Sequence, residues 1–531
     1  TTNQSGSTGV IQGSYYASLD RSANLNSTGI YYYNPYSGQK MKDGSGTSYG
    51  SATSTNDILQ VALDLDNDKI WWGINNTWQA SGDPAAGTNA AYTDLTDSDY
   101  TPVVGYGAAY TSILNTGQTA LAYTPPTGFK LLNTANLPAP TYTDPRKYFA
   151  TLLYKSTEET RTVRGCFDST GTAWAPDFLW VKDRDATTNF TLVDSVRGPN
   201  AGIVFSSSDV AAQTPTYDGV TAFIEGGFTV GHDASDYFNN PANRNYVAFA
   251  IRAGGAPTVE NDNTSGAMDD GSVFKGGTVQ TSYTPAGSPD IYPRKMSIAE
   301  HGGFSIVQYV GNGTDDQDVP HGLDTSHPDG GKPGFILIKR TNATANWVVG
   351  HDGLNVDGDG LPFTDFMNLD VNAQAYDADA VWSDKAPSST VFTLGNGGGV
   401  NASSGAYIAY LFQRVPGLIG IGKYTGNNSA DGAYVIVDDG ASGFRPAWLM
   451  IKNVGAAGNW FIYDAARNPV NVVNEYLIAD GTAAAATSGP VQCDFTANGF
   501  KLRSTNDGTN NGSYIYLAFA DQAFQLQARA R

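Results

Sequence analysis

Cysteine is nearly absent from this sequence of 531 residues. Its two cysteines, Cys166 and Cys493, lie far apart and occupy non-equivalent places in the repeats described below. Two single cysteines form neither a disulfide framework nor a zinc site. Because free cysteine is among the most buried residue types, we expect two small buried apolar side chains. Stability must then come from core packing, with or without oligomerisation.

Long apolar segments are absent as well. No run of about 18 apolar residues occurs, so we predict no membrane-spanning helix and no membrane insertion. No signal peptide is recognisable. The sequence begins at Thr1 rather than at a methionine, which is compatible with a segment lost before it.

Basic residues are scarce: the sequence has 31 Lys and Arg but 51 Asp and Glu, which gives a formal net charge of −20. Such a surface repels phosphate backbones, so nucleic acid is not an expected partner. Lys, Glu and Leu are too sparse for long amphipathic helices. The abundant residues are Tyr (30), Phe (23) and Gly (61), together with Asn, Thr and Ser. Aromatic and β-branched residues with turn formers predict an all-β protein of three to five domains.

Three segments of the sequence repeat one pattern. Each runs over six steps from a proline to a lysine, and an asparagine followed by an aromatic residue comes seven residues later. The distance from the proline to the asparagine is 13 in all three copies. The copies are Pro176–Lys182 with Asn189 and Phe190, Pro333–Lys339 with Asn346 and Trp347, and Pro446–Lys452 with Asn459 and Trp460.

The similarity extends outward from these segments. A strand with a tyrosine precedes each proline, a strand with a Gly-Phe type pattern follows, and a closing strand ends the copy. The closing strands alternate a face of large residues with a face containing Tyr and Ala, as in a sandwich strand with one face in the core. The residues are Tyr154, Tyr309 and Tyr424, then Phe228, Phe392 and Phe500, then Tyr246–Ile251, Tyr407–Phe412 and Tyr514–Phe519.

The Pro-to-Lys strands are apolar on both faces. In the first copy Phe178 and Trp180 point one way, and Leu179 and Val181 point the other. A strand of this kind is central in its sheet and is covered on its outer side as well. The proline at its start removes a backbone donor where the ladder has not yet begun.

These patterns divide the chain into tandem antiparallel β-sandwiches in an elongated, multi-domain arrangement. Repeated sandwiches make rod-like or plate-like arrays. The segment between the first two copies is rich in Gly, Pro, Thr and Asp, and is expected to be an ordered linker, an extra hairpin or an arm to another subunit. The predicted parts are an N-terminal sandwich (1–141), repeat 1 (146–253), the inserted segment (254–300), repeat 2 (301–415), repeat 3 (416–521) and a C-terminal tail (522–531).

The N-terminal part contains a predicted hairpin. Val61, Leu63 and Leu65 alternate with shorter or polar residues, Asp66 to Lys69 form a tight turn, and Ile70 to Trp72 return. This hairpin, with Tyr123–Phe129 and with Leu137-Pro138, resembles the SPRY domains of phage virion proteins over about 100 residues. The resemblance implies an antiparallel, lectin-like sandwich that binds proteins or serves as a structural module.

The three repeats are similar to an uncharacterised domain of marine phage appendage proteins. The best-kept stretch is PDFLWVKDR through LVDSVRGP in the first copy. The resemblance implies a virion structural role and brings no catalytic residues. The stretch Asp194–Gly198 becomes His351-Asp-Gly-Leu in the second copy and Asp464-Ala-Ala-Arg in the third, so a ligand site there would not occur three times.

Few residues suggest chemistry. The repeated lysines Lys182, Lys339 and Lys452 are either ligand contacts or, as we favour, strand ends whose stems lie on the core while the ammonium reaches water or a carboxylate. Possible oxygen ligands for a structural calcium ion occur in two acidic stretches, of which the second lacks the glutamate that would complete an EF-hand loop. These stretches are Asp64, Asp66 and Asp68, and Asn355 to Gly360 with Asp357 and Asp359, where Phe366 takes the twelfth position.

No catalytic or cofactor-binding residue is predicted. The sequence contains no HExxH, GxSxG or Walker pattern, and no pair among its 51 acidic residues is singled out for glycoside hydrolysis. The histidines are scattered, and for His321 and His327, in a Gly/Pro/Asp loop, we expect solvated side chains: the full set is His232, His301, His321, His327 and His351.

Tyrosines crowd the N-terminal region. They either stack on sugars or subunits, or, as we favour, form the core and edges of the sandwich. They are Tyr15, Tyr16, Tyr31, Tyr32, Tyr33 and Tyr36.

The leading hypothesis is a non-enzymatic, oligomeric structural protein on the external surface or tail of a virion. A tail fibre or similar appendage of this kind contributes to host recognition or particle assembly. Its partners would be its own copies, other virion proteins and a host surface glycan or protein. A capsid decoration protein, a depolymerase spike that degrades host polysaccharide and a bacterial adhesin remain alternatives.

Overall fold

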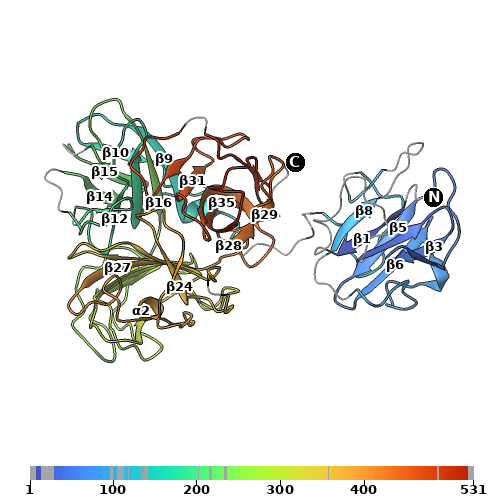
Figure 1. The fold of residues 1–531 in the computed structure, drawn as a ribbon, viewed down its shortest axis with the longest axis horizontal. Coiled ribbons are helices and arrows are strands. Elements are labelled where there is room, and N and C mark those ends of the chain that lie inside the picture. The colour runs from blue at the N-terminus through green and yellow to red at the C-terminus, as the bar shows by residue number, and fades with distance from the viewer. Residues whose placement is uncertain are drawn as a thin grey trace. The chain divides into compact units, whose positions relative to one another are not determined.

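The computed structural model describes residues 7–12, 29–95, 100–104, 113–117, 119–133, 136, 142–200, 202–213, 218–232, 236–356, 358–486 and 489–523. Two compact units are present: unit 1 is Thr1–Leu137 and unit 2 is Pro138–Arg531. Antiparallel sheets make up nearly all of the regular structure in both units, so the predicted all-β class is confirmed (Figure 1). Among the described residues no helix is both long and apolar enough to span a bilayer.

Unit 1 contains a five-stranded and a three-stranded sheet. The predicted hairpin is confirmed, with Asp64 opposite Lys69 across the turn. Trp72 from its second strand is buried, whereas Val61 and Leu65 are 37% and 38% exposed. The sheet orders are β4(Ser45–Ser48)-β3(Gln39–Lys42)-β2(Ile30–Asn34)-β1(Thr8–Gln12)-β8(Tyr100–Val104) and β5(Leu59–Asp64)-β6(Lys69–Ile74)-β7(Thr77–Trp78).

Several N-terminal predictions can be placed. Tyr31, Tyr32 and Tyr33 are buried, as favoured, whereas Tyr36 is 71% exposed. Tyr15 and Tyr16 lie outside the described residues, as do Leu137-Pro138 of the SPRY resemblance. That resemblance stays a prediction.

Unit 2 contains the three repeats, which we call module 1 (146–253), module 2 (301–415) and module 3 (416–521). In modules 1 and 3 a five-stranded sheet faces a three-stranded sheet. Module 1 is built from β13(Val204–Phe205)-β12(Thr191–Asp194)-β11(Phe178–Asp183)-β16(Asn245–Ile251)-β9(Phe149–Lys155) and β10(Arg161–Arg164)-β15(Gly227–Val230)-β14(Val220–Ile224). Module 3 is built from β28(Ile419–Thr425)-β35(Ser513–Ala523)-β30(Phe444–Asn453)-β31(Phe461–Asp464)-β32(Leu477–Ile478) and β29(Tyr434–Ile436)-β34(Gly499–Leu502)-β33(Cys493–Thr496).

Module 2 has the same plan with additions. The inserted segment 254–300 forms strands that extend its large sheet beside β20, so the extra-hairpin alternative describes this segment. A short helix, α2(Asp379–Trp382), lies near the end of the module. The sheets are β18(Thr278–Val279)-β17(Val273–Lys275)-β19(Lys295–Ile298)-β20(Phe304–Val310)-β27(Ala406–Phe412)-β22(Phe335–Arg340)-β23(Val348–His351)-β24(Asp365–Asn368)-β25(Tyr376–Asp377) and β21(Gln317–Pro320)-β26(Val391–Leu394).

The Pro-to-Lys strands β11, β22 and β30 are central in their sheets, as predicted, and both faces are covered. In β11 Leu179 and Val181 point into the core of the module's own sandwich. Phe178 and Trp180 point outward into a second cluster, which also receives the outward residues of β22 and β30. We call this cluster the shared core; its members include Phe149, Phe178, Trp180, Phe304, Phe335, Leu337, Phe412, Trp448, Met450, Leu517 and Phe519.

The closing strands β16, β27 and β35 differ from the prediction. Only one face was expected in a core, but both are buried. In β16 Tyr246 and Ala248 face the module's own sandwich, and the larger Val247 and Phe249 face the shared core. Large side chains on this face are needed because it packs against other modules rather than against water.

The three modules of unit 2 therefore do not follow one another in a row. They form a triangle whose large sheets meet at one centre (Figure 1). A cavity of about 20 Å³ at that centre is lined by Phe149, Trp180, Leu337, Phe412, Trp448 and others. It is apolar and has room for about one water molecule without the polar partners that would hold it. The shared core is thus close-packed.

Truncation of a shared-core side chain should destabilise all of unit 2. Trp448 is 2% exposed and contacts Phe149, Trp180 and Phe249 of module 1. We expect Trp448→Ala to lower the free energy of unfolding in urea by about 3–5 kcal/mol, because it leaves a cavity between modules. The control is Tyr434→Ala, at a side chain that is 51% exposed, which should change it by about 0.5 kcal/mol or less. Equal effects of the two substitutions would contradict this packing.

Candidate functional site

The contacts between modules in unit 2 form the most extensive polar arrangement in the described part of the chain, and we call them seams 1–2, 2–3 and 3–1. One backbone hydrogen bond recurs in all three. Each acceptor lies two positions after a repeated lysine, and the donors follow the cycle of modules. The bonds run from Ala212 N to Thr341 O (2.9 Å), from Ala375 N to Val454 O (3.0 Å) and from Ala485 N to Arg184 O (2.9 Å). Unit 2 thus has pseudo-threefold symmetry.

The repeated lysines lie at these seams. Lys182, Lys339 and Lys452 are each 0% exposed, and burial lowers the pKa of each amine to about 8. Their ammonium groups donate to main-chain carbonyl oxygens, instead of reaching water or a carboxylate as expected. Two of these bonds cross a seam: Lys182 Nζ to Thr482 O (3.1 Å) and Lys339 Nζ to Asp209 O (2.9 Å).

The aromatic residue after two of the three repeated asparagines also bonds across a seam. The indole nitrogen of Trp347 donates to Phe205 O of module 1 at 2.7 Å, and that of Trp460 donates to Asn368 O of module 2 at 3.0 Å. Phe190 of module 1 has no such donor. At that seam Ser206 Oγ donates to Ala479 O of module 3 at 2.8 Å. Each seam thus has a side chain that donates to a main-chain carbonyl of the neighbouring module, although the donor is an indole at two seams and a serine at the third.

Seam 1–2 has a buried ion pair of module 1 that is bonded by a tyrosine of module 2. Arg197 Nε lies 2.6 Å from Asp194 Oδ2, and both side chains are almost fully buried. The hydroxyl of Tyr410, from module 2, donates to Asp194 Oδ2 at 2.8 Å and receives a bond from Arg197 Nη2 at 3.1 Å. The Tyr410 hydroxyl thus joins both members of the ion pair across the seam.

Seam 3–1 repeats the ion pair without the tyrosine. Arg467 pairs with Asp464, both are 0% exposed, and Arg467 Nη1 has no hydrogen-bond partner. Phe249 of module 1 takes the place that Tyr410 has at seam 1–2, since it packs on Trp448 (5.8 Å) as Tyr410 packs on Phe178 (4.8 Å). Seam 3–1 therefore lacks the hydroxyl that bonds Asp194 and Arg197 at seam 1–2. The unpaired Nη1 of Arg467 has a different cause, because its counterpart Arg197 Nη1 donates to Gly202 O.

Seam 2–3 departs further from the pattern. His351 replaces the aspartate and is 0% exposed, with Nε2 3.2 Å from Tyr516 O of module 3. Beside it, Arg414 binds Asp352 Oδ2 at 2.6 Å and lies 3.1 Å from Asp438 Oδ2 of module 3. Burial lowers the pKa of His351, so the ring at this seam is neutral.

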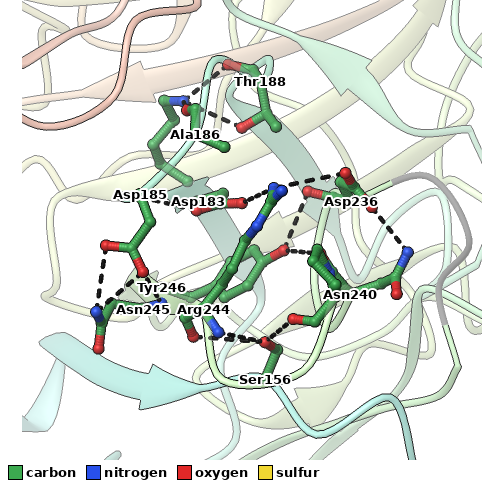
Figure 2. A network of polar contacts seen from close by, with 12 residues as sticks. Ser156, Asp183, Asp185, Ala186, Thr188, Asp236, Asn240, Arg244, Asn245 and Tyr246 are labelled. Atoms are coloured by element: carbon green, nitrogen blue, oxygen red, sulfur yellow. Dashed lines mark hydrogen bonds and ion pairs between the residues drawn. The ribbon is translucent and has the colours of Figure 1, made fainter.

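A further polar network braces the loop before β16 in module 1 (Figure 2). Arg244 Nη1 lies 2.8 Å from Asp183 Oδ2 and 3.5 Å from Asp236 Oδ2, and Tyr246 Oη donates to Asn240 O at 2.7 Å. Asp185 Oδ2 accepts from Asn245 N at 2.7 Å. Each carboxylate of this network has a partner, either Arg244 or Asn245, as in a structural brace.

Three buried asparagines have one role that the sequence did not reveal. Asn239, Asn401 and Asn510 are each 0% exposed, and their side-chain oxygens accept a backbone N–H just after the first strand of their module. They precede Tyr246, Tyr407 and Tyr514 by seven, six and four residues. This unequal spacing hides the repeat from a comparison of offsets.

Among the described residues, Asp64, Asp66 and Asp68 do not form a group of carboxylates close enough to share an ion. Asp64 accepts from Asn67 N (3.1 Å) as a turn residue, and Asp359 accepts from Leu361 N (2.8 Å). Asp357 lies outside the described residues. One acidic group that the sequence did not single out has carboxylates close enough to share an ion, namely the exposed Asp377, Asp379 and Asp384.

Two histidine predictions were wrong, whereas the cysteine prediction is confirmed. His321 and His327 are not solvated but are 0% and 5% exposed, because their ring nitrogens bond main-chain groups inside module 2. Burial lowers the pKa of His321 to about 4. Cys166 and Cys493 are free and buried, and burial raises the pKa of both thiols.

The comparison with protein families assigns unit 2 to a family. A family described as a domain of unknown function (DUF7483) matches residues 144–288 and 291–523. The chain belongs to this family. The match covers module 1 with most of the inserted segment, and then modules 2 and 3, so the DUF7483 residues are those that build the shared core and its seams. No curated protein matches the chain.

The tyrosine at seam 1–2 provides a paired prediction. Tyr410→Phe removes the hydroxyl between Asp194 and Arg197, and we expect a loss of about 1–3 kcal/mol because buried charged groups lose a partner. Phe249→Tyr supplies the equivalent hydroxyl at seam 3–1 and should stabilise unit 2 by about 1 kcal/mol. Chemical denaturation measures both. Opposite signs support the pseudo-symmetry, whereas a destabilising Phe249→Tyr contradicts it.

The buried lysines provide a further prediction, on the stability of the protein and its dependence on pH. Lys339→Met leaves Ala345 O without its donor, and we expect a loss of about 1–3 kcal/mol at pH 7. The folded pKa of about 8 lies below the ordinary 10.5, so the unfolded chain binds the proton more tightly between these values. Stability of the parent protein should therefore rise with pH over that window, and less steeply in the variant. Lys332→Met, at an exposed lysine of the same module, is the control and should match the parent.

Proposed function

We propose that this chain is a non-enzymatic structural protein of a virion. In this proposal it belongs to a tail fibre or other external appendage and contributes to host-surface recognition or particle assembly. Its partners are other copies of the chain, other virion proteins and a host surface glycan or protein. The observation that carries a scaffold role is the shared core, on which all three modules converge.

The buried polar groups of unit 2 support a scaffold. The lysines that recur in the sequence donate to main-chain carbonyls. The buried Asp–Arg pairs lie at the seams or in the turns beside them. A catalytic group must reach the substrate and must have a donor or acceptor atom that is not already bonded within the protein. Side chains that are fully buried and already bonded meet neither need, and they favour rigidity instead.

The differences between modules support recognition by one part rather than by all. The scaffold strands agree in the three copies, whereas the loops that begin at Asp194, His351 and Asp464 differ. Loops on a rigid scaffold are where binding residues concentrate. Recognition would then be specific to one module or to unit 1.

Two other functions are distinguished by location and chemistry. A capsid decoration protein would use the same rigid unit at another attachment point. A depolymerase spike would need two carboxylates about 5–9.5 Å apart beside bound sugar. The exposed cluster of Asp377, Asp379 and Asp384 is the place to test for it.

The proposal is tested by locating the chain on particles whose genome encodes it. Gold-labelled antibodies raised against the purified full chain should decorate an external appendage in electron micrographs, while pre-immune antibodies should not. Label spread over the capsid would instead favour decoration. Absence from particles, or release of reducing sugar from host glycans that is lost in Asp379→Asn, would overturn the proposal.

A further inference from the structure

The ring of His351 bonds another module, since its Nε2 faces Tyr516 O across seam 2–3 (3.2 Å). Its other nitrogen, Nδ1, accepts a hydrogen bond from Gly353 N at 2.8 Å. An acceptor at Nδ1 and a donor at Nε2 define one neutral tautomer. A second proton would have to go on Nδ1, where it would oppose the N–H of Gly353.

The charges around His351 act on its protonation in opposite directions. Asp352 Oδ1 is 3.4 Å from Nδ1, but this carboxylate is already held by two nitrogens of Arg414. Arg414 in turn also binds Asp329 and Asp438. Lys423 of module 3 adds a further positive charge near the ring, and the ring edge packs on Phe335 at 5.8 Å. Burial, Arg414 and Lys423 outweigh the pull of Asp352, and the pKa of His351 is lowered.

The other two seams have no histidine in the corresponding place. Seams 1–2 and 3–1 use the Asp194–Arg197 and Asp464–Arg467 pairs in the corresponding place. The other buried histidines, His321 and His327, bond groups within module 2 alone. At seam 1–2 burial raises the pKa of Asp370 to about 6, so the folded state takes up that proton more readily and acid does not open the seam. Protonation of His351 acts in the opposite sense, because its folded pKa is lowered.

We propose that seam 2–3 is an acid-sensitive latch, in which protonation of His351 separates module 3 from module 2 while seam 1–2 stays closed. The proton enters at Nδ1, displaces the Gly353 hydrogen bond and places a cation beside Arg414 and Lys423 in a buried seam. The open state lets water solvate the imidazolium. This switch would let a particle protein change its shape on passing from neutral to mildly acidic surroundings, and it holds whether or not the chain is part of a virion.

Hydrogen exchange of the full chain tests this proposal at pH 7.5, 6.5, 5.5 and 4.5, after correction for intrinsic rates. Below the ordinary histidine pKa of 6.5, the opening constant for β23 and for β35 around Tyr516 should rise by up to tenfold per pH unit, the limit for one proton. Strand β12 at seam 1–2 should show no such rise. An equal response at β12, or none at β23, would overturn the proposal.

Variants assign the response to one ring. His351→Gln keeps a neutral donor toward Tyr516 O and should abolish the acid response at β23, whereas His232→Gln, at an exposed histidine of module 1, should leave it unchanged. Persistence of the response in His351→Gln would overturn the assignment. If that variant does not fold, nitrogen NMR of the parent protein with labelled histidines decides: a His351 ring that becomes cationic near pH 6.5 while β23 stays protected contradicts the latch.

Discussion

The outer faces of three β-sheets carry large apolar side chains, and these faces leave water only by packing against one another. Phe178 and Trp180 of β11, with their counterparts in β22 and β30, have no covering layer within their own modules. Burial of such side chains is the dominant favourable contribution to folding. A triangle of modules is the arrangement by which each face covers the other two.

Because the sheets pack against one another, the polar groups at the edges of the shared core must form hydrogen bonds with protein atoms instead of water. The lysines at the strand ends are buried, and main-chain carbonyls of a neighbouring module take the place of water around Lys182 and Lys339. The indoles of Trp347 and Trp460 bond across seams for the same reason. These contacts fix which modules are neighbours and in what order, whereas the apolar core alone would tolerate other arrangements.

The sequence predicted the strands better than it predicted their surroundings. Alternation in Phe178-Leu179-Trp180-Val181 was enough to place β11 at the centre of a doubly covered sheet, because side-chain direction in a strand follows from position alone. What covers the outer face depends on residues more than 100 positions away, so the triangle was not foreseen. His321 and His327 were misplaced because loop composition does not reveal burial. The seam contacts were recognisable only as repeats, and the substitution of His351 for aspartate marked a difference without indicating its chemistry.

The central claim is that a module cannot bury its outer face alone. Residues 146–253 expressed by themselves test it most directly, with analytical ultracentrifugation for mass and amide NMR for folding. The account predicts a chain that is unfolded or that associates, with trimers reproducing the pseudo-threefold core from identical copies. A monodisperse, well-dispersed and stable monomer would contradict it.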